Sequence, residues 1–338
     1  MASPQILVGT AGWSYPDWEN LVYPSAKAID RLRMVARYLD CVEVDSSFYH
    51  PPAPQTAANW VKATAAQPDF RFLAKAWQRF THERTTPWTQ AEHDLFARGL
   101  APLREAERLD ALLFQFPWSF RNDARNRDWL ARVADTFANW PVAVELRHDS
   151  WLGDATDSTL EFFRARRLTF CNIDQPGLGH CIQPASHATT DTGYYRLHGR
   201  NARNWFREKQ DAYGGPSPRR ASSAKAALAA AAGSGSRLGK AFGTTWVGHA
   251  GGRYDYLYSE TELAELEPKI QRVAAKAKKT FVVFNNHKDA KAFSNALQMK
   301  ARLSPGAKLH APAPLVRRYP ALRATGAIPD GDEQLPLV

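Results

Sequence analysis

Eight short apolar runs recur along the chain, and most of them end in charged or amide residues. Helix-period segments separate most of the runs, and short apolar runs bounded by turns are typical of buried strands. The runs are Ile6–Trp13, Cys41–Phe48, Phe70–Trp77, Ala111–Pro117, Val142–His148, Leu168–Asp174, Tyr194–Gly199 and Thr280–His287. Strands that alternate with helices through right-handed crossovers form a parallel sheet. Eight such units predict an α/β fold, a closed parallel (β/α)8 barrel of the TIM type.

Several intervening segments carry helix signals. Ala28–Leu39 has an apolar stripe with helical spacing. Thr89 with Glu92, and Ser259 with Glu262, have the spacing of a capping box at a helix start. Further helical segments are expected at Trp129–Phe137, Leu160–Arg167 and Asp289–Leu303.

Two connections and the end of the chain depart from the ideal pattern. Gln175–Asp191 has little helical pattern, so the connection after the sixth run is expected to lack a helix. The insertion after the seventh run, about residues 200–258, has a centre rich in Ala, Gly, Ser and Pro, and we expect much of it to be mobile. We therefore expect one barrel domain over residues 1–303 and an extended tail over residues 304–338.

Composition narrows the class of protein. A length of 338 residues suits one barrel with insertions. The net charge of +10 favours nucleic acid or anionic small substrates, and it also fits a simple solubility bias. The three cysteines form no C-x-x-C pattern, which argues against a disulfide framework or a structural zinc site. No run approaches the ~20 apolar residues of a membrane helix, and Met1–Gly9 shows no secretory signal. We expect a cytoplasmic protein without a membrane partner; its oligomeric state stays open.

The polar residues at the ends of the runs are predicted to share one opening. In a parallel barrel the carboxyl ends of the strands converge on one face, and side chains two residues apart lie on the same face of a strand. The pairs with this spacing are Glu43 with Asp45, Glu145 with Arg147, Arg196 with His198, and Asn285 with His287. We expect these pairs, with Lys75 and Asp174, to face the lumen.

The predicted opening combines cations, carboxylates and imidazoles. Lys75, Arg147 and Arg196 match the oxygens of a phosphate or carboxylate. Glu145 or Asp174 is the candidate base, His198 the candidate acid, and Glu43 a further candidate catalytic carboxylate. Asn285, His287 and Asp45 complete the predicted substrate-binding set. The alternative is a buried salt-bridge network that only locks the lumen.

Aromatic residues follow the predicted strand ends, where they could stack on bases or sugars or simply pack under loops. They are Trp13, Tyr15, Phe48, Tyr49, Trp77, Trp118, Trp151 and Trp205. We include Trp13 and Tyr49 in the predicted substrate-binding set.

The cofactor stays unknown. Glu145, Asp174, His198 and His287 are residue types that ligate hard metal ions. Nearby arginines would repel a divalent cation, so a metal is compatible with the pattern but not favoured. The chain has no phosphate-cradling glycine loop, no dinucleotide fingerprint and no G-x-S-x-G elbow.

Ordered segments of the chain resemble the YecE-like family, a domain of unknown function. They include Val8–Tyr15, Glu43–Tyr49, Leu112–Pro117, Glu145–His148, Tyr194–Asn201, Tyr254–Ser259 and Phe284–His287. The resemblance runs over roughly residues 6–300 and implies a TIM-type barrel, in agreement with the apolar pattern. It implies no reaction, because the activity of the family is unsettled.

The leading hypothesis is an enzyme that acts on a phosphate-bearing small molecule or nucleic acid. A hydrolase of phosphoesters is favoured, and hydrolysis of nucleic-acid phosphodiesters is one form of it. Basic residues of the insertion are either a flap that meets phosphate or a solvated face; they are Arg219, Arg220, Lys225, Arg237, Lys240 and Arg253. The alternatives are a non-catalytic nucleic-acid-binding barrel and a sugar isomerase or glycoside hydrolase.

Overall fold

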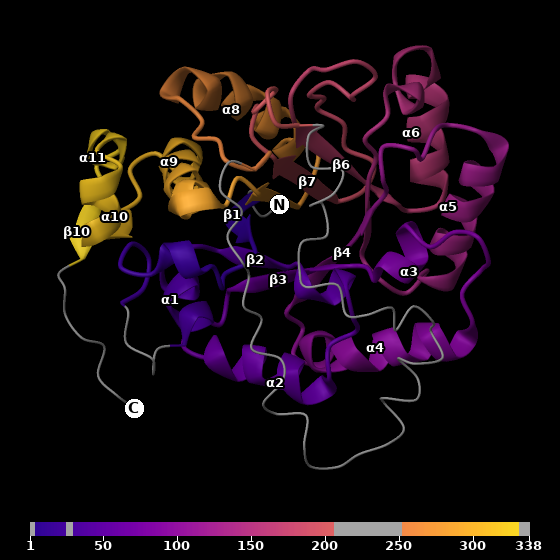
Figure 1. Ribbon diagram of the computed structural model, residues 1–338, viewed down its shortest axis with the longest axis horizontal. Coiled ribbons are helices and arrows are strands. Elements are labelled where there is room, and N and C mark those ends of the chain that lie inside the picture. The colour runs from indigo at the N-terminus through magenta and orange to yellow at the C-terminus, as the bar shows by residue number, and fades with distance from the viewer. Residues whose placement is uncertain (1–3, 25–29, 206–251, 331–338) are drawn as a thin grey trace.

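Eight parallel strands close a barrel in the computed structural model, which describes residues 4–24, 30–205 and 252–330 (Figure 1). The strands are β1 Gln5–Ala11, β2 Cys41–Val44, β3 Arg71–Lys75, β4 Leu109–Gln115, β5 Val142–Glu145, β6 Thr169–Asp174, β7 Thr192–Leu197 and β8 Lys279–Phe284. Each strand pairs with the next in sequence, and β8 pairs with β1 to complete the ring. The predicted (β/α)8 fold is therefore confirmed.

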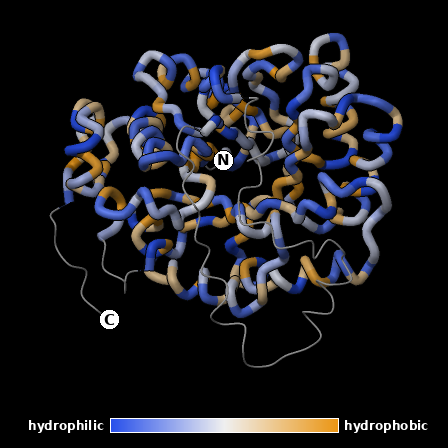
Figure 2. Tube along the Cα trace, viewed as in Figure 1, coloured by the Kyte–Doolittle hydropathy of each residue, from blue (hydrophilic) through white to orange (hydrophobic). Residues whose placement is uncertain are grey.

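Helices surround the barrel, and both hydrophobic and hydrophilic residues occur along each of them (Figure 2). They are α1 Arg31–Tyr38, α2 Pro54–Ala63, α3 Gln78–Thr81, α4 Gln90–Glu105, α5 Ala124–Thr136, α6 Thr156–Ala165, α8 Glu260–Ala274 and α9 Lys291–Leu303. Both predicted capping boxes form, with Thr89 capping α4 and Ser259 capping α8. The sequence pattern missed α2, because Ala57 is its one fully buried residue and its apolar stripe is weak.

Strand alternation separates the lumen from the helix side. The apolar residues between the polar pairs, such as Val144 and Leu197, are fully buried. Leu197 belongs to the same hydrophobic cluster as Leu263 and Leu266 of α8. The helices are thus held to the barrel by one face of each strand, and the other face is left for the lumen.

The connection between β6 and β7 has no helix, as predicted. The centre of the insertion after β7, residues 206–251, lies outside the described residues, as do the predicted basic residues from Arg219 to Lys240. The described ends of the insertion are Trp205 and the segment from Gly252 to Ser259.

The prediction of an extended tail is wrong over residues 304–330. This segment forms β9 His310–Pro312, α10 Ala313–Arg318, α11 Ala321–Ala324 and β10 Ile328–Asp330, with β9 and β10 paired in parallel. It lies at the edge of the molecule beside α9 (Figure 1). Prolines are tolerated in the first turn of a helix. Leu315, Tyr319 and Leu322 are buried at helical spacing, so the proline-rich composition concealed two short helices.

Candidate functional site

Five strands bring polar side chains to the carboxyl-terminal end of the lumen. These residues are Glu43 of β2, Lys75 of β3, Glu145 of β5, Arg196 of β7 and Asn285, which directly follows β8. Arg196 hydrogen-bonds to Glu43, although the two lie 153 positions apart in sequence. We call this end of the barrel the mouth.

Arg196 is the centre of a buried ion-pair network. Its Nε and Nη2 donate to the two oxygens of Glu43 at 2.9 and 2.6 Å, and its Nη1 donates to Oε2 of Glu145 at 2.5 Å. The Tyr194 hydroxyl donates to Glu43 at 2.7 Å, and Nε of Arg147 donates to Oε1 of Glu145 at 2.7 Å. Buried charges persist when they are paired and hydrogen-bonded in this way.

The network sets the ionisation of its carboxylates. Burial by itself would raise the pKa of Glu145, but the attraction of Arg196 and Arg147 is stronger and holds that pKa well below its ordinary value. Burial raises the pKa of Glu43, and Arg196 and the Tyr194 hydrogen bond act in the opposite direction. Glu145 is an ionised carboxylate with both oxygens engaged, which makes it a weak base.

The expected role of Arg196 as an anion clamp is corrected by this geometry. Each of its three nitrogen atoms already donates to Glu43 or Glu145. The side chain is 1% exposed. Arg196 therefore holds two carboxylates in place, and this part of the lumen is a buried salt-bridge network, the alternative to an anion clamp.

Two nitrogen atoms at the edge of the network have no hydrogen-bond partner within the described residues. They are Nη2 of Arg147, a residue that is 7% exposed, and Nε2 of His198, which lies 3.4 Å from Oε1 of Glu145. A buried donor without a partner costs about 1–3 kcal/mol, and more when it is charged. A ligand oxygen would remove this cost, so these two atoms mark the candidate binding position.

The His198 ring is neutral at physiological pH. Burial lowers the pKa of His198 to about 3, against the attraction of Glu145. The amide nitrogen of Asn285 lies 3.0 Å from Nδ1 of His198. A hydrogen bond donated there leaves the ring proton on Nε2. The expectation that His198 is the acid is corrected, because the ring is a fixed hydrogen-bond donor rather than an imidazolium.

Charged and aromatic side chains line the rim of the mouth. Nζ of Lys75 lies 3.4 Å from an oxygen of Asp45 and 4.6 Å from the centre of the Phe48 ring. His287 stacks on Tyr15, with ring centres 4.5 Å apart. Lys75, Asp45 and His287 are therefore near the opening but already contact other residues.

The aromatic residues of the predicted rim divide into two groups. Tyr49 is 41% exposed and meets the edge of Phe48, while Trp13 packs edge-on against Trp60 of α2. Trp77 and Trp151 are buried against Phe80 and Phe120. Trp77 and Trp151 therefore belong to the core, and fewer than the eight predicted aromatic residues can line the rim.

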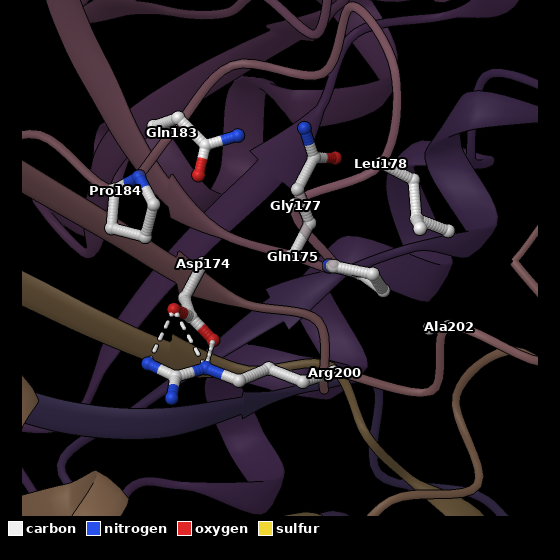
Figure 3. A pocket seen from close by; sticks show the side chains of 9 residues that line it. Asp174, Gln175, Gly177, Leu178, Gln183, Pro184, Arg200 and Ala202 are labelled. Atoms are coloured by element: carbon white, nitrogen blue, oxygen red, sulfur yellow. Dashed lines mark hydrogen bonds and ion pairs between the residues drawn. The ribbon is translucent and has the colours of Figure 1, made fainter.

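Asp174 does not join the lumen network. It accepts hydrogen bonds from Nη2 of Arg200 at 2.9 Å and from the Tyr258 hydroxyl at 2.7 Å. Figure 3 shows Asp174 facing Arg200 in the wall of a separate pocket of about 390 Å³. Cys171 of β6 is close enough for Glu145 and Arg196 to affect its pKa, and residues 171 and 174 lie on opposite faces of the strand. The expected catalytic role of Asp174 in the lumen is corrected.

Two residues of the mouth were not predicted. Tyr194 lies two positions before Arg196, so strand alternation could have placed it in the lumen. The ring of Tyr254 lies 6.2 Å from His198 and 5.7 Å from His287. Tyr254 precedes α8 in an irregular segment, where no periodic signal predicts its direction.

Within the described parts of the chain, no group of three or more His, Cys, Asp or Glu side chains is placed to hold a metal ion. Over the same ranges, no helix is both long and apolar enough to cross a membrane. The three cysteines are buried and form no disulfide.

Comparisons with known proteins agree with this architecture. The family described as "Protein of unknown function DUF72" matches residues 7–318. The UPF0759 protein YunF of Bacillus subtilis is 28% identical over 301 residues, which cover 87% of this chain and 93% of that protein. The UPF0759 protein YecE of Escherichia coli is 29% identical over 55% of this chain and 65% of its own length.

Solved structures give the same result. A DUF72 family protein from Thermotoga maritima is 29% identical, with a TM-score of 0.66, and the match covers 88% of this chain and 99% of that one. A DUF72 family protein from Enterococcus faecalis is 25% identical, with a TM-score of 0.69, over 90% of this chain and 97% of that one.

Proposed function

This chain belongs to the DUF72 family, whose description assigns no reaction, and from the geometry of the mouth we propose an enzyme that acts on a phosphate-bearing ligand. The observation that carries the proposal is the buried Nη2 of Arg147, a charged donor without a partner in the described residues. A guanidinium offers several donors in one plane and matches the oxygens of a phosphoryl group.

The neighbouring side chains supply the rest of an anion site. Nε2 of His198 lies 3.4 Å from Oε1 of Glu145, the same oxygen that accepts from Nε of Arg147, and the Asn285 amide beside Nδ1 holds the ring. Lys75 adds a positive charge at the rim. Glu145 holds Arg147 by the Nε hydrogen bond, so its role in this proposal is to position the guanidinium.

The charge of the mouth favours a phosphodiester over a phosphomonoester. The cations Lys75, Arg147 and Arg196 are matched in number by Glu43, Asp45 and Glu145. Arg253, whose guanidinium lies 5.1 Å from the Tyr254 ring centre, adds one positive charge. These seven side chains carry one surplus positive charge, which fits the single negative charge of a diester. Asp17 and Asp255 act on His287 at the rim and pair with Lys288 and Lys291.

Hydrolysis of such a diester is the reaction we propose. Phosphoryl transfer depends mainly on positioning and on stabilising charge at the phosphoryl oxygens. Arg147 and His198 can serve both needs without a strong base. The ligand is a small molecule or a nucleic acid, and the chemistry of the mouth is the same for both.

The sugar-enzyme alternative has less support. Glycoside hydrolases use two carboxyl groups, one of them as a proton donor. Here both oxygens of Glu43 accept hydrogen bonds from Arg196, and both oxygens of Glu145 accept from Arg196 and Arg147.

Phosphate binding by an Arg147→Met variant tests the proposal. We expect inorganic phosphate and bis(4-nitrophenyl) phosphate to bind the wild type and to bind the variant roughly 10–100-fold more weakly, the effect of losing a charged hydrogen bond. Isothermal titration calorimetry measures both affinities, and circular dichroism checks the fold. Arg33→Met, which removes an exposed arginine on α1, is the matched control and should bind like the wild type. Equal affinity in Arg147→Met and the wild type would refute the proposal.

A further inference from the structure

Tyr254 lies at the mouth, where several basic groups surround it. Its ring centre is 6.2 Å from that of His198 and 5.7 Å from that of His287. The Arg253 guanidinium lies 5.1 Å from the Tyr254 ring and 5.7 Å from the Trp205 ring. The described ends of the insertion therefore meet directly beside the proposed anion site.

The proposed reaction needs a group that gives a proton to the leaving oxygen, and Glu145, His82, His198 and Asp174 are unsuited to it. Glu145 is ionised and holds no proton, because Arg196 and Arg147 depress its pKa. Burial lowers the pKa of His82 to about 3, with Lys75 and Arg147 acting in the same direction. His198 has an equally low pKa, and Asp174 lies on the far side of β6.

Tyr254 differs from these residues because its acidic group is a phenol, which ordinarily has a pKa of about 10 and becomes a stronger acid beside positive charges. Burial raises the pKa of its phenol, but the positive charges outweigh burial and set the pKa below the ordinary value. Those charges come from Arg253 in its own segment, Arg147 after β5, Lys75 of β3 and Arg196 of β7. Arg147 in turn is affected by the charge of Tyr254, so the two side chains are electrostatic neighbours.

We propose that Tyr254 is the general acid of the mouth, acting on the leaving oxygen of a phosphodiester held by Arg147 and His198. The inference rests on the proposed function. Water attacks phosphorus, the bond from phosphorus to the leaving oxygen breaks, and the phenol proton passes to that oxygen. The attacking water gives up one proton, which returns to the phenolate as the monoester leaves. The products are an alcohol and a phosphomonoester, and no oxidant or metal is consumed.

Substitution Tyr254→Phe tests this role with two diesters that differ in their leaving group. Thymidylyl-(3′→5′)-thymidine releases an alkoxide that needs a proton, whereas bis(4-nitrophenyl) phosphate releases a nitrophenolate that does not. We expect Tyr254→Phe to lower kcat by about 100-fold for the dinucleotide, the usual size of a general-acid effect. KM should stay the same, and the nitrophenyl diester should lose less than about threefold. Equal losses on both substrates would overturn the acid role.

The pH dependence of phosphate binding separates this inference from the proposed function. A bound anion disfavours the neighbouring phenolate, so ionisation of Tyr254 should weaken phosphate binding. Between pH 8 and 10.5, the affinity of the wild type for inorganic phosphate should therefore fall more steeply than the affinity of Tyr254→Phe, by up to about tenfold per pH unit. Binding in the wild type with the same pH profile in Tyr254→Phe overturns the assignment of Tyr254 alone. Failure of phosphate to bind the wild type, or equal binding in Arg147→Met, overturns the anion site and the acid role with it.

Discussion

Arg147 and His198 are the residues on which the chemistry of the mouth depends, because each is buried with one donor unpaired. The other buried donors of the network are already paired, which fixes their positions. A ligand would therefore bind at the edge of the network, beside Arg147 and His198. A protein that keeps a buried guanidinium partly unpaired gives up stability at that position. An oxyanion that binds in the mouth and accepts from this guanidinium would recover that stability.

The neutral state of His198 predicts how stability changes with pH. The folded protein binds a proton on His198 only near pH 3, whereas the unfolded chain binds it near pH 6.5. The neutral His198 ring therefore contributes its full share to the free energy of unfolding above about pH 6.5. Below that pH the contribution falls by about 1.4 kcal/mol per pH unit, the value for one group. We expect urea-unfolding free energies to fall more steeply between pH 6.5 and 5 in the wild type than in His198→Gln.

Two comparisons make that measurement decisive. His82 has the same low pKa, so His198→Gln keeps part of the slope. The exposed His180 is the matched control, and His180→Gln should keep the wild-type slope. A slope in His198→Gln identical to that of the wild type would show that the buried ring is not held neutral.

Strand alternation predicted part of the mouth, because a period of two fixes the face of each strand side chain. It placed Glu43, Glu145, Arg147 and Arg196 together correctly. It could not predict that the Arg196 guanidinium is fully paired with Glu43 and Glu145, because that depends on distances between side chains of β2, β5 and β7. The roles of the arginines therefore required the structure.

At the scale of the elements, local signals predicted the strands and the capped helices and failed where the pattern is weak. Asp174 was predicted to face the lumen, but it lies three positions after Cys171, whose pKa is affected by Glu145 and Arg196, and this odd spacing puts it on the opposite face of β6. α2 and the two short helices after Leu303 were missed because few buried residues or many prolines mark them.

The capping box of α4 gives a prediction at this scale. The Thr89 hydroxyl accepts from the Glu92 backbone, and the Glu92 carboxylate accepts from the Thr89 backbone at 2.7 Å. We expect Thr89→Ala to lower the free energy of unfolding by about 1 kcal/mol, measured by urea denaturation. Thr85→Ala, in the exposed segment before the helix, should change it by less than about 0.5 kcal/mol. Equal effects would mean that the box does not stabilise the helix.

At the scale of the whole molecule, closure of the barrel is what brings the chemistry together. β8 pairs with β1, so residues from both ends of the chain border the same opening. The stacked rings of Tyr15 and His287 join those two ends at the rim. The described ends of the insertion, Trp205 and Tyr254, both lie near His198. A site assembled from five strands and one insertion exists only in the closed barrel.

A crystal structure of the protein soaked in inorganic phosphate would show whether Arg147 and His198 form an anion site. We expect a phosphate in the mouth, with oxygen atoms at about 2.7–3.2 Å from Nη2 of Arg147 and Nε2 of His198. A mouth without phosphate at concentrations that saturate binding in solution, or phosphate bound only beside Arg200, would contradict this expectation.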